Sequence, residues 1–266
     1  MYEAKPVSAI RWVGKIQENG IKGHCAAVTS LYHVRKAEKR ETHQRSLVRL
    51  TSNQPMNIPI ETIIKELQKE RPGFHSEADF QHAVAWEIHR HHPTSAVRLE
   101  VDRGTAEQRE HLDILVKDSD RTCAIELKYK TRKLDTVFGG ERFHLRNHGA
   151  QDIGRYDFIK DIVRLERFVI GNANSVGYAI FLTNDDSYWK DAKSLTTADA
   201  MFRIGENRTL NGELRWSELT GAGTMKGRES PLSLNGSHAI HWVDYSRLDV
   251  QGPGRFRYAL LEVSTT

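Results

Sequence analysis

Residues 111–130, HLDILVKDSDRTCAIELKYK, decide the fold. Two apolar runs flank the short polar turn DSDR, which predicts a β-hairpin. Side chains alternate between the two faces of a strand, so Glu126 and Lys128 share one face of the second arm with Ala124. At about 3.3 Å per residue the two charged side chains leave the backbone roughly 6.6 Å apart, close enough to act on one ligand. An edge strand that turns its charges to water is the alternative.

The first arm carries an acid in its middle as well. Asp113 shares a face with His111 and Leu115, while Leu112, Ile114 and Val116 share the other. If the arms pair around DSDR, Asp113 falls opposite or diagonal to Glu126.

Two neighbouring carboxylates repel each other, and a divalent cation removes that repulsion. Hard oxygen ligands favour magnesium or manganese. Lys128 beside them supplies a fixed positive charge, able to orient a water and stabilise charge on a phosphate. The hairpin therefore predicts metal-dependent phosphodiester hydrolysis.

Helical and strand patterns surround the hairpin. Apolar residues at i, i+3, i+4 and i+7 predict a helix that Pro72-Gly73 ends, and Ser76 is a good N-cap for a second helix. Residues 131–149 are expected to form a long loop. The order of elements predicts an α/β sandwich with a mixed sheet between helices. The predicted helices are about 59–71, 76–92 and 150–169, and the other predicted strands are 96–101, 176–184, 239–245 and 256–263.

Composition narrows the class of protein. The chain has 266 residues, of which 38% are hydrophobic and 28% charged, as in globular proteins. No apolar run approaches the roughly 20 residues that span a bilayer, and no hydrophobic signal region opens the sequence. The only cysteines, Cys25 and Cys123, are expected to be free thiols. A cytoplasmic protein without a membrane partner is expected.

The positive charge lies at the beginning of the chain. Residues 1–55 hold ten Lys/Arg and four Asp/Glu, so the remaining residues carry a net −2 of the total +4. We expect a basic N-terminal extension over 1–55, whose role the sequence does not reveal, and one domain over 56–266.

The order of the charged residues resembles a known family. Asp113, twelve intervening residues and then Glu126-Leu127-Lys128, preceded by a helix with an acid, look like the PD-(D/E)xK nuclease superfamily. The resemblance covers about residues 74–182. It departs from the motif at Leu112, which stands where the motif has proline, a departure that many members share. It implies a restriction-endonuclease-like αβα sandwich with a central mixed β-sheet, a magnesium or manganese cofactor, and DNA as substrate, with RNA open.

Glu77, in the first turn of its helix, resembles the helix glutamate of the Holliday-junction-resolvase branch. The resemblance therefore implies Asp113, Glu126 and Glu77 as metal ligands and Lys128 as the residue that orients the attacking water. Glu87 is the alternative helix acid. Glu77 could instead only stabilise the helix N-terminus through the helix dipole.

Other candidates are less specific. Gln151 and Arg155, at i and i+4, could contact one phosphate, although Asp152, Asp157, Asp161 and Arg164 beside them are also typical of solvated ion pairs. Residues Arg142, His144, Arg146 and His148 of the expected loop could contact DNA phosphates. His89, His91 and His92 end a helix and are expected to need no metal.

A catalytically inactive nucleic-acid- or partner-binding module on the same fold is the rival function. The sequence leaves a homodimer open.

Overall fold

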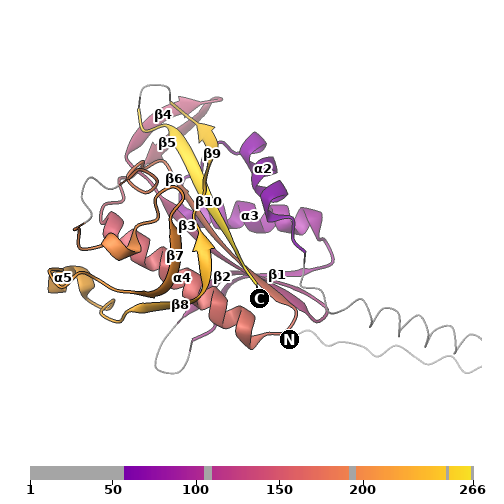
Figure 1. Ribbon diagram of the computed structural model, residues 1–266. Helices are drawn as coiled ribbons and strands as arrows, with labels where there is room; N and C mark the ends of the chain where they lie inside the picture. The colour runs from indigo at the N-terminus through magenta and orange to yellow at the C-terminus, as the bar shows by residue number, and fades with distance from the viewer. Residues whose placement is uncertain (1–56, 105–109, 192–195, 250–251, 265–266) are drawn as a thin grey trace, which may run out of the picture. The chain divides into compact units, whose positions relative to one another are not determined.

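The computed structural model describes residues 57–104, 110–191, 196–249 and 252–264 (Figure 1). The predicted basic extension, residues 1–55, lies outside them, as does Cys25. The described chain is an α/β domain around a six-stranded sheet, in the order β1-β2-β3-β6-β10-β9. β3 and β6 run parallel and the other neighbours antiparallel, so the predicted mixed sheet is confirmed. The six strands are β1 Ala96–Asp102, β2 His111–Asp118, β3 Arg121–Lys130, β6 Ser175–Thr183, β9 Trp242–Arg247 and β10 Arg255–Val263.

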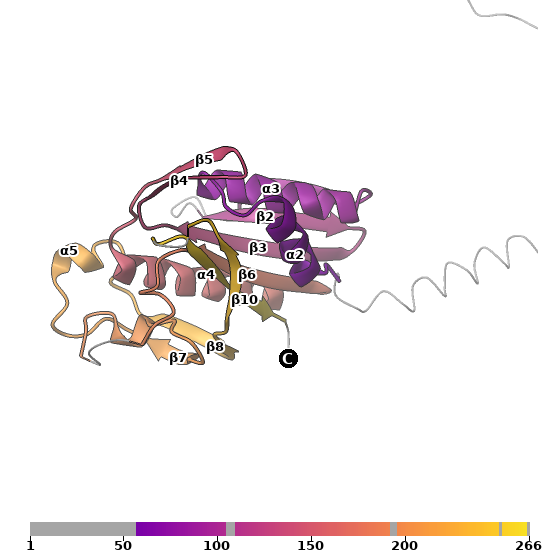
Figure 2. The same ribbon diagram turned by 90° about the horizontal axis from the view of Figure 1, so that it is seen from above.

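Helices cover both faces of this sheet. α2 (Ile60–Glu70) and α3 (Glu77–His91) lie on one face and α4 (Gln151–Gly171) on the other (Figure 2). α2 and α3 share one hydrophobic cluster and α4 packs on a second one, and β3 contributes to both clusters. No helix in the described ranges is long and apolar enough to cross a membrane.

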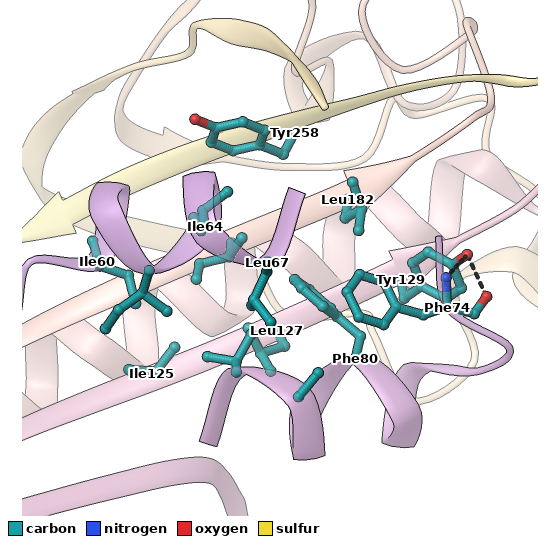
Figure 3. Packing of buried hydrophobic residues seen from close by; sticks show 14 of the residues in the cluster. Ile60, Ile64, Leu67, Phe74, Phe80, Ile125, Leu127, Tyr129, Leu182 and Tyr258 are labelled. Carbon is teal, nitrogen blue, oxygen red and sulfur yellow. Dashed lines mark hydrogen bonds between the residues drawn. The ribbon is translucent and has the colours of Figure 1, made fainter. Parts of the chain in front are cut away.

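The α2/α3 face shows why these segments are helical. The apolar stripe of α2 is buried against the sheet, and Ser76 caps α3 by accepting a hydrogen bond from the backbone N–H of Asp79. Between the helices the Tyr129 hydroxyl donates to the Phe74 carbonyl at 2.7 Å (Figure 3). This bond fixes the entry of α3 over the end of β3.

The β2–β3 hairpin forms as predicted, with Asp118 opposite Arg121 at the turn and Ile114 opposite Ile125. One expectation was wrong. Leu112 packs with the cluster under α4 instead of sharing a face with Ile114. The strand is irregular here, because the residue between the paired Leu99 and Val101 of β1 is Glu100, which has a φ of 50°.

The predicted loop over residues 131–149 was also wrong, because it contains a second hairpin. β4 (Leu134–Phe138) and β5 (Glu141–Leu145) pair around Gly139 and Gly140, whose φ values are 59° and 85°. Positive φ at both central residues is the requirement of the tight hairpin turn that glycine favours. The buried side chains of this hairpin join the cluster under α2 and α3.

The segment between β6 and β9 holds elements that the sequence did not reveal. β7 (Thr209–Leu214) and β8 (Leu232–Ala239) form a separate two-stranded sheet. The short helices η1 (Ala200–Phe202) and α5 (Ala222–Met225) accompany it. Leucines of both strands join the cluster under α4, so this segment extends the core on that side.

Candidate active site

Two of the predicted acids bind the free edge of β3. The ladder between β2 and β3 ends at the Ile114–Ile125 pair. Beyond it the backbone N–H of Leu127 donates to Asp113 Oδ2 at 2.6 Å, and the N–H of Tyr129 donates to Glu77 Oε2 at 2.8 Å. Backbone amides two residues apart point to the same edge of a strand. Asp113 and Glu77 therefore lie side by side along this edge of β3, while Glu126 and Lys128 project from the face of the same strand.

Glu126 and Lys128 project toward α4. Lys128 Nζ lies 2.5 Å from Asp161 Oδ2, and Arg164 Nη2 lies 2.9 Å from Glu126 Oε2. Arg164 also contacts Asp161, one turn earlier on the same helix. The four side chains form a network between β3 and α4 in which two carboxyl groups alternate with two cations. Sequence reasoning missed Asp161 and Arg164, whose spacing resembles that of surface ion pairs.

Burial opposes the ionisation of these acids. Desolvation raises the pKa of Asp113 to about 6, although Lys128 and the Leu127 N–H oppose the shift. Desolvation and then repulsion from Asp161 raise the pKa of Glu126 to about 10, against the attraction of Arg164. Burial disfavours the charge of Lys128, but the neighbouring carboxylates outweigh it and raise its pKa above the ordinary value. Burial and the repulsion between the carboxyl groups therefore favour a protonated Glu126 as long as no further cation binds.

The donors fit a hard divalent cation in part. Glu126 Oε2 is buried and, despite its closeness to Arg164, makes no hydrogen bond. Asp113 lies beside it on the paired strand, and carboxylate oxygens are the ligands that magnesium and manganese prefer. The three predicted ligands, however, are not gathered as tightly as the sequence implied. In the described ranges, one group of three potential metal ligands has atoms that all lie within 4.8 Å of one another, and that group lies elsewhere in the fold. Asp113 and Glu126 thus form the fitting pair, with Glu77 as their neighbour.

Two pockets give access to these acids. A 190 Å³ pocket reaches Glu126 beside α4, and a 540 Å³ pocket reaches Glu77 at the end of β3. Cationic side chains line both, which suits a polyanion. They are Arg103, Arg164 and Arg167 in the smaller pocket and Lys130 and Arg146, with His75, His144 and His148, in the larger.

Comparisons with known proteins add no relative. No protein-family model, curated protein or solved structure matches the chain. The functional argument therefore rests on the order of Glu77, Asp113, Glu126 and Lys128 and on their placement in the fold.

The helix acid at the site is Glu77. Glu87, the alternative, is buried farther along α3, where Arg90 Nη1 donates to its Oε2 at 2.8 Å. Glu77 also lies 3.8 Å from Lys130, so it faces the larger pocket.

The predicted phosphate contact of Arg155 is not supported. Arg155 is only 3% exposed and lies between internal acceptors: it donates to Asp199 Oδ2 at 2.7 Å and to the Ser187 carbonyl at 2.6 Å. Gln151 donates to Asp185 Oδ2 at 2.9 Å. These two residues fasten α4 to the segment after β6, and no contact joins them to the acids on β3.

Proposed function

We propose that the protein is a metal-dependent nuclease that hydrolyses phosphodiester bonds, most of all in DNA. The observation that carries the proposal is the placement of Asp113, Glu126 and Lys128 on adjoining arms of one hairpin, with Glu77 bound to the same strand edge. Helices on both faces of a mixed sheet support a restriction-endonuclease-like fold for the domain. The order of acid, acid and lysine agrees with the resemblance of the sequence to the PD-(D/E)xK superfamily.

Each side chain has a chemical role in this proposal. Asp113 and Glu126 would hold magnesium or manganese, with Glu77 positioning that end of the strand. When bound, the metal lowers the pKa of a water and polarises the phosphoryl oxygen. Lys128 holds the attacking water and stabilises the negative charge that grows on the phosphate. Asp161 fixes the direction of the Lys128 ammonium from α4.

The larger pocket suits the polynucleotide backbone. Lys130 and Arg146 face the same space as Glu77, and His144 and His148 line its wall. Phosphate contacts of this kind position a nucleic acid without reading its sequence. The β4–β5 hairpin supplies one side of this pocket through His144.

A binding module without catalysis is the second candidate, and one observation favours it. Lys128 and Glu126 already have internal partners in Asp161 and Arg164, and Glu126 is only 2% exposed. A site satisfied in this way could hold the sheet to α4 and leave the basic pockets to bind nucleic acid.

Cleavage assays with the full chain separate the two functions. Labelled single-stranded DNA, duplex DNA and RNA are incubated with magnesium, manganese or EDTA. The wild type and the control Asp244→Asn, on the exposed side of β9, should cut in metal and not in EDTA. Asp113→Asn and Lys128→Ala should lose at least about 100-fold in rate. Equal binding by all variants without cleavage supports the binding module, and metal-independent cleavage by all variants contradicts the proposed site.

A further inference from the structure

A second cluster of ligand side chains lies between α2 and α3. Glu66 projects from α2, and Glu87 and His91 lie one turn apart on α3. His91 Nε2 is 2.7 Å from Glu66 Oε2 and 3.4 Å from Glu87 Oε1. One ligand atom from each side chain lies within 4.8 Å of the other two. Two packed helices thus bring an imidazole and two carboxylates to one point.

One oxygen of the buried Glu87 has no hydrogen-bond partner within the cluster. The side chain is 97% buried, and Arg90 binds its Oε2. Its Oε1 is buried too, points toward His91 and Glu66, and has no hydrogen-bond partner. A buried carboxylate oxygen without a hydrogen bond is costly unless a cation compensates it. Glu66 and His91 are partly exposed, so an ion can reach the site from solvent.

We propose that Glu66, Glu87 and His91 bind a zinc ion. One imidazole nitrogen and two carboxylate oxygens are a ligand set that zinc accepts, with water in the fourth position. An imidazole ligand disfavours magnesium, which prefers oxygen. The ion would link α2 to α3, on the opposite face of the sheet from Lys128 and α4, so the site does not depend on the proposed nuclease activity. His91 would then bind a metal ion, although the sequence predicted that it needs none.

The competing explanation is a purely internal ion pair. A protonated His91 between Glu66 and Glu87 would satisfy the same three groups without metal. The two explanations differ in what added zinc does to the protein.

Zinc binding to the full chain is measured by equilibrium dialysis with elemental analysis and by melting temperature. The variants are His91→Ala and the milder Glu66→Gln, with His89→Ala as control, because His89 is exposed on the same helix. The wild type and His89→Ala should each bind one zinc ion per chain at this site. His91→Ala and Glu66→Gln should each lack that ion. At a zinc concentration about 100-fold above the dissociation constant, the melting temperature should rise by about 5–10 °C in the wild type and His89→Ala only.

Equal zinc content in all four proteins overturns the proposal, as does a melting temperature that zinc leaves unchanged in the wild type. If His91→Ala does not fold, Glu66→Gln decides, because Glu66 lies on the partly exposed side of the cluster. An Asp113→Asn protein should keep the zinc, which separates this site from the candidate active site.

Discussion

Lys128 Nζ lies 2.5 Å from Asp161 Oδ2, so the lysine that the sequence places at the candidate site is held by an acid from the opposite layer. Together with the contact between Arg164 and Glu126, this pair joins the charged face of β3 to α4. The arrangement makes Asp161 a positioning residue for Lys128. It also means that the state of the site depends on a helix that begins more than twenty residues after the hairpin.

Asp161→Asn should therefore lower the rate of cleavage and change its pH dependence. Removal of this carboxylate lowers the pKa of Lys128, because Asp161 is the largest influence that raises it against burial. The alkaline limb of the pH–rate profile should move to lower pH, and kcat should fall more than KM rises. An unchanged alkaline limb with a lower melting temperature would show that Asp161 is only structural.

Glu126 should make the metal-free protein less stable as pH rises. Its pKa, like that of Asp113, is higher in the folded state, so the folded protein keeps a proton that the unfolded chain releases. The contribution of this proton to the free energy of unfolding is fully present below the ordinary carboxyl pKa. It is lost as the pH rises toward 10, by at most about 1.4 kcal/mol per pH unit for one group.

Melting temperatures in EDTA between pH 6 and pH 9 measure this effect. Glu126→Gln should flatten the fall, and the exposed control Glu213→Gln should not. Added magnesium should also flatten the fall in the wild type. The same slope in wild type and Glu126→Gln would exclude a raised pKa for Glu126.

Arg155→Ala should destabilise the fold and leave nucleic-acid binding unchanged per folded molecule. The substitution removes one of the two guanidinium partners of the buried Asp199 and leaves it only Arg203, so the cost should stay below the roughly 3–5 kcal/mol of a buried charge that loses its pair. Urea unfolding measures it, with the exposed Arg142→Ala as control, for which no change is expected. A stable Arg155→Ala protein that binds DNA more weakly would instead support the phosphate contact that the sequence suggested for Arg155.

The larger pocket should set the salt dependence of DNA binding. In an Asp113→Asn background, Lys130→Ala and Arg146→Ala should each weaken binding and reduce the slope of log K against log salt by about 0.9 for duplex DNA. Arg142→Ala is the matched control, since Arg142 lies on β5, four residues before Arg146, pairs with Asp135 and does not line the pocket. An equal loss of slope in Arg142→Ala would mean that the charge of the surface as a whole, and not the pocket, attracts the nucleic acid.

Alternation within a strand was the strongest signal in the sequence. It placed Glu126 and Lys128 on one face of β3 and predicted Asp113 beside them, because a short hairpin fixes register over few residues. It failed at Leu112, where the strands are irregular opposite Glu100. A local distortion of this kind leaves no clear trace in a pattern of apolar and polar residues.

Contacts between segments that are distant along the chain could not be predicted from the sequence. Asp161 and Arg164 have the spacing of surface ion pairs, and only the packing of α4 on β3 buries Asp161 and half-buries Arg164. Arg155 was expected at the surface because nothing in the sequence shows that Ser187 and Asp199 contact it. The β4–β5 hairpin did have a signal, Gly139-Gly140 between two strand-like runs, and a stricter search for two-residue turns would have found it.

The central claim is that Asp113 and Glu126 together hold the metal at which a phosphodiester is cut. Anomalous diffraction from crystals soaked in manganese tests it most directly. The account predicts a peak bound by carboxylate oxygens of both residues, with Lys128 beside it and a separate position from any ion at Glu66 and His91. No peak between Asp113 and Glu126 in fully soaked crystals, with Asp113 still bound to the Leu127 N–H, would contradict the account.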